Sequence, residues 1–500
     1  MFRRIVLCCL ALAMVLSTFL LASCTSDDGN DGTTTPAVTT EDPNKTPGSV
    51  VDNTTSAYED DDLPDSFEFE DDEIDMLYWE DTEHVEFIAE DMNGNAVNDA
   101  IYKRNSTTES RLDVKINFIP AKGNSSNISN FIGVVEKSDP DTVDVIASYS
   151  RTVALLATKG YLDDLSDSTY INYDKPWWPA SLVEEATIGD SLYFVSGDIS
   201  TNLLYMMYAV VMNKDLATEH SIPNVYELID NYEWTIDKLI ELTAGVGFDE
   251  DNNEKKSSGD KFGFVVSTIH TDPFWYGAGL NYVVHDKNGD LVISDSFGAE
   301  KEKAHDVINK MLQLCYGSID GFYGTTGTMG RDIFAAGRSL FLSDRGPQVA
   351  EVKLREVDFK YSLLPTPMYN TAQKKYITTL AFPYTMYGIP SNASDSTKLM
   401  ADAFIECMAS ESYRTVTPAL FETVMKLQYA DSNDDSRMYD IIREGVTFEL
   451  GRIYCDDLGG YPYSLFRNSI SGNSNTWSSQ CQIKGSIMGQ FLDALVSKFE

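Results

Sequence analysis

Hydrophobic and polar positions alternate with two different periods along most of the chain. Residues 141–150, DTVDVIASYS, hold a short apolar run that predicts a buried strand, and residues 151–160, RTVALLATKG, predict a helix that ends at Gly160. Further helices are predicted at 224–231, at 235–245 with Thr235 as N-cap, and at 396–410, and a further strand at 339–344. This alternation favours an α/β fold with ligand sites at the carboxyl ends of its strands.

The longest apolar run lies at the N-terminus. Arg3 and Arg4 precede residues 5–22, a run that predicts a secretory signal peptide. The run also reaches the lower length limit of a membrane-spanning helix, so an uncleaved anchor is the alternative. Residues 21–24, LASC, resemble the lipobox of bacterial lipoproteins, which implies cleavage before Cys24 and diacylation of that cysteine. We therefore predict a signal peptide over residues 1–23 and a lipid anchor at Cys24.

The chain is strongly acidic. Its 38 basic and 78 acidic residues give a formal net charge of -40, which argues against binding to nucleic acid or to an anionic lipid surface. Residues 24–75 are rich in Ser, Thr, Asp, Gly and Pro, and residues 58–75 alone carry 11 carboxylates. Such a segment predicts a disordered tether over residues 24–75. The rest of the chain is long enough for two lobes.

Familiar catalytic motifs are missing from the sequence. It contains no nucleophile elbow, phosphate loop, zinc motif or dinucleotide fingerprint, and its five histidines are scattered without the spacing of metal ligands. Carboxylates are so frequent that no pair is singled out for glycoside hydrolysis. Cys315 and Cys407 fall in helical apolar stripes and are predicted to be buried thiols, whereas a disulfide between Cys455 and Cys481 is left open. We therefore predict neither enzymatic activity nor a cofactor.

One acidic loop has part of the spacing of a calcium site. Residues 249–260, DEDNNEKKSSGD, place Asp249, Asp251, Asn253, Ser257 and Asp260 at positions 1, 3, 5, 9 and 12 of such a loop. Glu254 stands where the loop requires glycine, and Asp260 is shorter than the usual bidentate glutamate. A solvated polar loop is favoured over a metal site.

Aromatic residues gather near the predicted strand ends. Trp79 and Tyr149 each stand at the end of a strand, and Trp275 and Tyr276 stand in a glycine-flanked loop, DPFWYGAG. Flat apolar faces can stack on sugar rings while neighbouring polar groups bond the hydroxyls. For any single aromatic residue, packing in the core is the alternative.

From about residue 76 to the end, the chain resembles the bacterial extracellular solute-binding proteins of family 1, the lipoprotein receptors of carbohydrate-type ABC importers. The resemblance is carried by segments that occur in the expected order: 97–105 with 111–118, 144–166, 175–200, 210–222 followed by 232–243, 333–344 and 363–370. Residues 381–390, AFPYTMYGIP, resemble the later hinge strand of that family.

The resemblance implies an α/β fold of the type II periplasmic-binding-protein class, with two lobes, a hinge and an interlobe ligand cleft. Lobe 1 would comprise residues 76–197 plus about 384–430, and lobe 2 about 198–383 plus 431–500. By position in the family pattern, the ligand contacts would be Trp79, Tyr149, Asp198, Asn202, Trp275, Tyr276, Ser343, Asp344 and Arg345, with Trp477 as a weaker candidate.

The implied function is capture of a sugar or oligosaccharide between the lobes and its delivery to the permease subunits of an ABC transporter. We expect a monomer on the extracellular face of the bacterial cytoplasmic membrane, held there only by the lipid at Cys24. A surface glycan sensor or adhesin on the same fold is one alternative, and a lipid-anchored glycoside hydrolase is another. Neither the solute nor the partner permease can be identified from the sequence.

Overall fold

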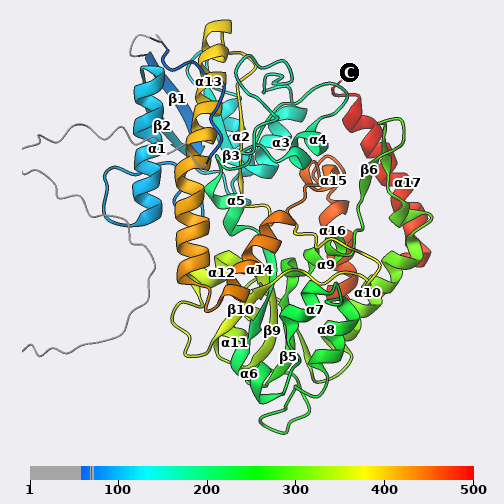
Figure 1. The fold of residues 1–500 in the computed structure, drawn as a ribbon. Coiled ribbons are helices and arrows are strands. Elements are labelled where there is room, and N and C mark those ends of the chain that lie inside the picture. The colour runs from blue at the N-terminus through cyan, green and yellow to red at the C-terminus, as the bar shows by residue number, and fades with distance from the viewer. Residues whose placement is uncertain (1–57, 68, 70–71, 500) are drawn as a thin grey trace, which may run out of the picture. The chain divides into compact units, whose positions relative to one another are not determined.

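A computed structural model describes residues 58–67, 69 and 72–499 of the chain. Its first sheet has four strands in the order β11-β3-β1-β2 (Figure 1). These strands are β1 (Asp72–Trp79), β2 (Val114–Ala121), β3 (Val145–Tyr149) and β11 (Thr385–Gly388). β1 pairs in parallel with β2 and β3, whereas β11 arrives from much later in the chain and pairs antiparallel with β3. The sheet is therefore completed by the segment in which the sequence predicts a hinge strand.

The second sheet has five strands in the order β10-β4-β9-β5-β8. They are β4 (Tyr208–Asn213), β5 (Phe262–Ser267), β8 (Gly321–Gly324), β9 (Ser339–Arg345) and β10 (Tyr361–Leu364). β5 pairs in parallel with β8 and β9, and β4 pairs antiparallel with β9 and β10. β6 (Val283–His285) and β7 (Leu291–Ile293) form a separate hairpin. The predicted two-lobed α/β fold is confirmed.

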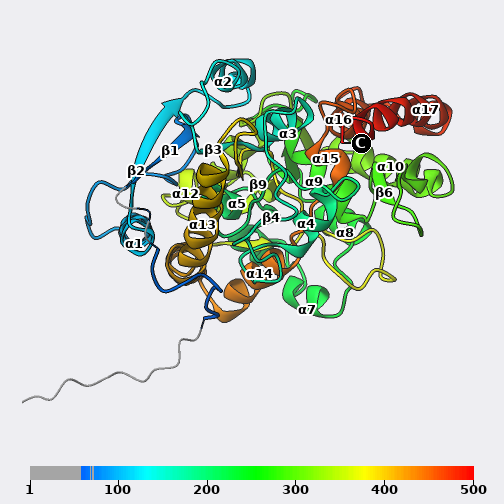
Figure 2. The same ribbon diagram turned by 90° about the horizontal axis from the view of Figure 1, so that it is seen from above.

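Helices flank both sheets. Around the first sheet and its continuation lie α1 (Ala96–Leu112), α2 (Ile128–Val135), α3 (Ser150–Thr158), α4 (Ala180–Ala186), α13 (Asp395–Glu411) and the π-helical segments η3 (Ser412–Val416) and η4 (Pro418–Gln428). α1 contacts α13 and η3, and Figures 1 and 2 show α1 and α13 side by side.

The helices between the strands of the second sheet are mostly short. They are α5 (Thr201–Tyr205), α6 (Lys214–Glu219), α7 (Val225–Asp230), α8 (Ile236–Thr243), η1 (Thr268–Thr271), α9 (Asp272–Gly277), η2 (Asp295–Phe297), α10 (Lys301–Tyr316), α11 (Met329–Ala335) and α12 (Gly346–Val352). The C-terminal part adds α14 (Asn433–Glu444), α15 (Leu450–Ile453), α16 (Tyr461–Ser471) and α17 (Trp477–Val496).

Local sequence signals account for several element boundaries. The helix predicted over 151–160 is α3, and Gly160 follows it with φ of 76°, a left-handed conformation that favours glycine. The Thr235 hydroxyl accepts a hydrogen bond of 3.2 Å from the Lys238 amide and so caps α8 as predicted. The strand predicted at 339–344 is β9, and the helix predicted at 396–410 lies within α13.

The folded body begins earlier than the predicted boundary at residue 76. Leu63 is buried, and the Asp61 carboxylate accepts hydrogen bonds from Arg111 at 2.7 Å, Arg414 at 2.9 Å and Ser410 at 2.6 Å. Burial alone would raise the pKa of Asp61, but these hydrogen bonds outweigh it and hold the pKa well below its usual range. Residues 58–67 therefore pack on the body instead of belonging to the tether. The composition reveals the carboxylates but not the arginines that bind them.

Other predictions for the N-terminal region concern residues 1–23, Cys24 and the rest of the tether up to residue 57, all of which lie outside the described residues. Across the part of the chain that the structure does describe, no helix combines the length and the apolar character needed to cross a membrane. Cys315 and Cys407 are buried thiols as predicted. Cys455 and Cys481 are also buried free thiols and form no disulfide.

Candidate functional site

The loops that follow β1 and β9 bring the two sheets into contact. Glu83 lies just after β1, and Arg345 is the last residue of β9. Nη1 of Arg345 donates to both carboxylate oxygens of Glu83, at 2.8 and 2.9 Å, and Nε2 of Gln348 in α12 donates to Glu83 Oε2 at 3.1 Å. A strand end of each sheet therefore contributes to one polar contact, as expected where two lobes meet at a ligand cleft.

A cavity of about 710 Å³ opens beside this contact. It is lined by Glu83, His84, Val85, residues 93–98 at the start of α1, Tyr205 in α5, residues Glu351, Val352 and Arg355 at the end of α12, and Val424, Gln428 and Tyr429. A volume of this size suits a ligand of several hundred Å³. The lining combines residues that follow β1 with residues of α12, so elements on both sides of the Glu83–Arg345 contact contribute to the cavity.

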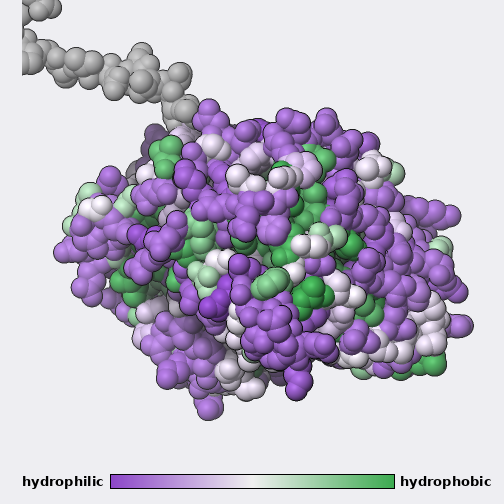
Figure 3. Space-filling model, turned by 90° about the horizontal axis from the view of Figure 1, so that it is seen from below, coloured by the Kyte–Doolittle hydropathy of each residue, from purple (hydrophilic) through white to green (hydrophobic). Residues whose placement is uncertain are grey.

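Two stacked rings form part of the wall of this cavity. The His84 imidazole lies 3.6 Å from the Tyr205 ring, centroid to centroid, with an interplanar angle of 10°. Burial lowers the pKa of His84 to about 4, so the imidazole is neutral at pH 7. Val85 and Val352 are 57% and 50% exposed and add apolar surface from both sides of the cavity. Elsewhere, the face seen in Figure 3 is mainly hydrophilic with scattered apolar patches.

Paired charges are buried behind the cavity, at the carboxyl end of the second sheet. Asp344 accepts hydrogen bonds of 3.0 and 2.7 Å from Arg331, and Nε2 of His270 lies 3.4 Å from the same carboxylate. Burial would raise the pKa of Asp344, but His270 and Arg331 outweigh it and lower that pKa. Burial also lowers the pKa of His270, to about 4. The Asp344–Arg331 pair is therefore charged at pH 7, and His270 is neutral.

A second buried carboxylate lies at the start of α9. Asp272 accepts hydrogen bonds from Arg452 at 2.9 Å and from Arg467 at 2.6 Å. Burial would raise its pKa, but the two guanidinium groups outweigh burial and lower it. The Arg452 guanidinium also lies 4.1 Å from the centroid of the Phe382 ring, and Arg151 in α3 lies 5.4 Å from the same centroid. Two guanidinium groups, one from α3 and one from α15, therefore lie near the Phe382 ring.

Next to Phe382 is a small cavity of about 10 Å³, room for a single water. Its lining consists of Ser150, Thr379, Leu380, Phe382, Tyr384, Thr447, Phe448, Glu449, Arg452 and Ile453. This lining combines three aromatic rings with an arginine and a carboxylate. A space of this size has no room for a sugar ring, so this cavity is not a candidate binding site.

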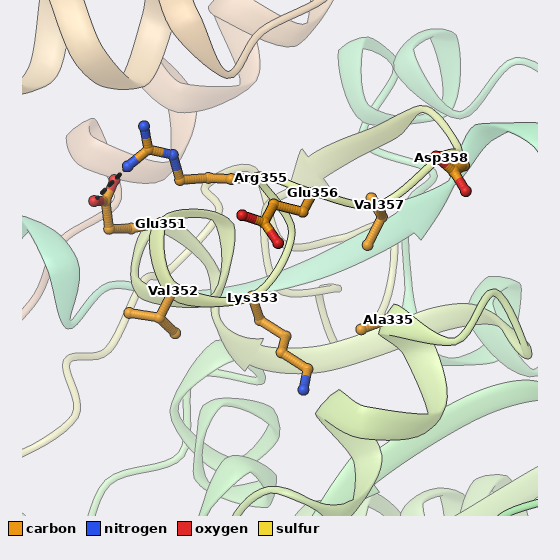
Figure 4. Close-up of a pocket in the computed structure, with 8 residues that line it drawn as sticks. All are labelled: Ala335, Glu351, Val352, Lys353, Arg355, Glu356, Val357 and Asp358. Carbon is orange, nitrogen blue, oxygen red and sulfur yellow. Dashed lines mark hydrogen bonds and ion pairs between the residues drawn. The ribbon is translucent and has the colours of Figure 1, made fainter. Parts of the chain in front are cut away.

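A depression of about 930 Å³ is a poorer candidate. Ala335, residues 351–353 and residues 355–358 line it, and Figure 4 shows Lys353, Glu356 and Asp358 pointing in different directions. Only one side of the structure contributes side chains, and most of them are charged. We therefore place the candidate site at the Glu83–Arg345 contact and its adjoining cavity.

A family model described as "Bacterial extracellular solute-binding protein" matches residues 105–416. The chain belongs to this family. No curated protein matches the chain.

Solved structures of other solute-binding proteins share the fold. The cyclic alpha-maltosyl-1,6-maltose binding protein from Arthrobacter globiformis is 14% identical, with a TM-score of 0.54 over 85% of this chain and 99% of that one. The GacH receptor of Streptomyces glaucescens, solved with acarbose, is 14% identical, with a TM-score of 0.52 and the same two coverages. UgpB from Mycobacterium tuberculosis, solved with glycerophosphocholine, is 14% identical, with a TM-score of 0.51 and again 85% and 99% coverage. At these identities the likeness shows the fold alone.

Three residues that the sequence predicts as ligand contacts of this solute-binding protein lie together at the end of β9. Ser343 donates to the His270 carbonyl at 2.8 Å, Asp344 pairs with Arg331, and Arg345 pairs with Glu83. Arg345 is the one of the three whose side chain reaches the cavity-lining Glu83. Ser343 and Asp344 support the site from behind.

Trp79 and Tyr149 lie under the first sheet's strand ends and are almost fully buried. Their ring centroids are 5.7 Å apart, and the Trp79 indole N–H donates to Thr385 in β11 at 2.9 Å. A Cβ at Gly123 would lie 2.7 Å from Trp79, so glycine is needed there for the chain to cover the indole. The structure therefore places both rings in the core beneath the cleft.

Trp275, Tyr276 and Trp477 also pack in the core. Trp275 lies in the helix α9 instead of the predicted loop, is 1% exposed, and has Tyr282 and Trp477 at centroid distances of 4.9 and 5.0 Å. Tyr276 donates to the Pro462 carbonyl, and the Trp477 indole donates to the Ser296 carbonyl. For these three residues the structure supports the alternative interpretation, packing in the core.

Asn202 is buried and Asp198 is partly buried where the first sheet leads into the second. Asp198 accepts from Thr417 at 2.8 Å and lies 3.3 Å from Arg443. The Asn202 side chain donates to Glu86, whose other oxygen accepts from Tyr387 at 3.1 Å. Both side chains therefore bind segments that are distant in sequence. Such contacts hold in place the segment that connects the first sheet to the second.

Sequence reasoning missed Glu83, His84, Tyr205, Gln348, Phe382 and Arg452. Gln348 could have been found, because it follows β9 within the first turn of α12 and so lies beside Arg345. Glu83 carries no such signal among so many carboxylates. Its role is visible only through its contacts with Arg345 and Gln348.

The acidic loop of residues 249–260 was expected to be solvated and polar. Carboxylate oxygens of Asp249, Asp251 and Asp260 can all lie within 4.8 Å of one another. Amides of the loop itself bind them: Glu254 donates to Asp249 at 2.8 Å, and Ser257 donates to Asp260 at 2.7 Å. These bonds account for the geometry of the loop.

Proposed function

We propose that this solute-binding protein captures a sugar or oligosaccharide in the cleft between its lobes and delivers it to the permease of an ABC transporter. The observation that carries the proposal is the contact of Glu83 with Arg345 and Gln348 at the edge of a cavity of about 710 Å³. A ligand there would touch segments of both lobes and so favour the closed form. Relatives of the same fold were solved with acarbose and with maltotriose, which supports a carbohydrate ligand.

The binding site would use two kinds of group. The stacked His84 and Tyr205 rings offer an apolar face, and Arg345 with Gln348 supplies hydrogen-bond donors. Hydrogen bonds made in a closing cleft act in a medium of lower dielectric constant than water. A ligand contact at Arg345 remains part of the proposal, whereas we assign structural roles to the other predicted residues.

Binding is tested by thermal-shift screening of the purified full-length protein against a broad glycan library, followed by calorimetric titration of the hits. A ligand at 100 times its dissociation constant should add about 2.7 kcal/mol to the stability.

Replacing Gln348 with alanine should weaken binding about tenfold, since it removes a hydrogen bond from a desolvated site. Asn288→Ala, in the exposed hairpin loop, is the control and should leave affinity unchanged. Turnover of a glycan would instead support a glycoside hydrolase, and equal affinity in the Gln348 variant would place the site elsewhere.

Lipid anchoring at Cys24 completes the proposal, because it would keep the protein near its permease on the extracellular face of the membrane. We expect a Cys24→Ala variant to appear in the soluble fraction or to accumulate as unprocessed precursor, since two acyl chains anchor stably and none can attach to alanine. Membrane fractionation and intact mass measure this. Unchanged processing together with membrane retention would contradict the lipobox interpretation.

A further inference from the structure

The carboxylate of Glu83 is bound by the side chains of Arg345 and Gln348, which together are called the cradle. Three donor contacts converge on it: Nη1 of Arg345 on both oxygens, at 2.8 and 2.9 Å, and Nε2 of Gln348 at 3.1 Å. Arginine and a neighbouring amide are well suited to bind a carboxylate, because their donors point at both of its oxygens. The cradle therefore has the chemistry of a carboxylate-binding subsite, filled by a residue of the same chain.

The exposed fractions of the three side chains show which of them can leave this contact. The Glu83 side chain is 36% exposed and lines the large cavity, whereas the Arg345 side chain is 10% exposed and Gln348 is 5% exposed. Glu83 thus stands between the cavity and the cradle. Among the described residues, Nε of Arg345 and Oε1 of Gln348 have no hydrogen-bond partner, so the cradle could bind a larger group than it now holds.

Charge decides what could replace Glu83. Arginine stays protonated in proteins, and Glu83 is the only ion-pair partner of Arg345 within the part of the chain that the structure describes. The neighbouring Asp344 is already paired with Arg331. If Glu83 turned out toward water and a neutral group took its place, the Arg345 charge would remain buried without a counter-ion, which is strongly unfavourable.

We propose that Arg345 and Gln348 form a subsite for a carboxylate of the ligand, which Glu83 fills in the ligand-free protein. The solute is then an acidic carbohydrate, such as an oligosaccharide that contains a uronic acid. This inference rests on the proposed function, since it names the class of sugar that the same cleft binds. Glu83 acts as an internal competitor that leaves when a ligand carboxylate arrives.

The net charge of -40 does not oppose this assignment. Charges farther away than about 8 Å are largely screened at physiological ionic strength. Next to the subsite, the Asp344 carboxylate is already paired with Arg331, and Arg345 is paired only with Glu83 among the described residues. A ligand carboxylate that displaces Glu83 therefore meets an arginine whose charge no other carboxylate neutralises.

The test is calorimetric titration of the full-length protein with oligosaccharides of galacturonic and glucuronic acid, each compared with its neutral counterpart of equal length. We expect at least one acidic sugar to bind about tenfold or more tightly than its counterpart. Arg345→Gln should remove this preference. Glu83→Ala should tighten binding of the acidic sugar about tenfold, because the competitor is gone, and so widen the preference for the acidic sugar over the neutral one. Arg338→Gln, at the opposite end of β9, is the matched control and should change neither affinity.

Failure of this inference can be told apart from failure of the proposed function. Neutral sugars that bind as tightly as acidic ones would overturn the carboxylate subsite and leave carbohydrate binding in place. No binding of any oligosaccharide to the wild type or to Glu83→Ala would overturn both. If Arg345→Gln melts at a much lower temperature than the wild type, Glu83→Ala decides alone: weaker binding of the acidic sugar would show that Glu83 contacts the ligand and does not compete with it.

Discussion

Replacing Trp275 with alanine is expected to lower the free energy of unfolding by about 3 to 5 kcal/mol, the range of large-to-small changes in a packed core. The indole is 1% exposed and lies between Tyr282 at 4.9 Å, Trp477 at 5.0 Å and Phe466 at 5.5 Å, centroid to centroid. These rings come from three separate segments, and the surrounding helices cannot all move in to fill the space. Urea denaturation measures the loss as a lower midpoint.

Two variants sharpen this experiment. Trp275→Phe keeps a ring in place and removes an indole N–H that finds no acceptor among the described residues, so it should cost only about 1 kcal/mol. Phe248→Ala removes a ring that is 56% exposed and should change stability by less than about 0.5 kcal/mol. If Trp275→Ala left the unfolding midpoint unchanged but weakened ligand binding, the indole would belong to the binding site.

Trp275 illustrates how a sequence pattern can be misinterpreted. Its neighbours in HTDPFWYGAG include proline and glycines, which are typical of a loop, and a large ring in a loop suggests a binding platform. Pro273, however, stands at the first turn of α9, where proline is favoured. Two of the rings that bury Trp275, those of Phe466 and Trp477, come about 200 residues later, and no local pattern predicts that they will meet.

The fold was more predictable than the site. The buried strands and amphipathic helices are local features, so β3, α3, α8 and β9 follow from short stretches of sequence. The return of β11 to the first sheet is a long-range pairing that periodicity cannot reveal. It was predicted only through the family resemblance of residues 381–390.

At the site, the sequence could single out Arg345 because of its place at a strand end, and its role as a ligand contact stays a prediction. Arg345 is the last residue of β9, and strand ends are where ligand sites lie in α/β folds. Glu83 was missed because it lies in an irregular loop of an acidic chain, where one carboxylate looks like any other. Its counter-ion, Arg345, is 262 residues away in sequence.

The second large effect is expected at Asp272. Its carboxylate binds Arg452 at 2.9 Å and Arg467 at 2.6 Å, and it joins the start of α9 to α15 and α16. Asp272→Asn removes the negative charge and leaves two arginines without their counter-ion. Breaking a buried pair in this way costs about 3 to 5 kcal/mol, so the variant should unfold at a much lower urea concentration than the wild type at pH 7.

The pH dependence gives the same prediction an independent test. The pKa of Asp272 in the folded protein is lowered from its ordinary value of 3.8. The ionised carboxylate therefore stabilises the fold fully at pH values above 3.8. This stabilisation is lost as the pH falls through the lower pKa of the folded state. The stability difference between wild type and Asp272→Asn should be constant from pH 7 to about pH 5 and shrink in more acidic solution. Asp237→Asn is the matched control: its partner Lys310 lies at 2.9 Å, but the carboxylate is 63% exposed, and such pairs contribute at most about 1 kcal/mol. If Asp272→Asn lowered the free energy of unfolding no more than Asp237→Asn does, water or the neighbouring rings would already stabilise the charges of Arg452 and Arg467.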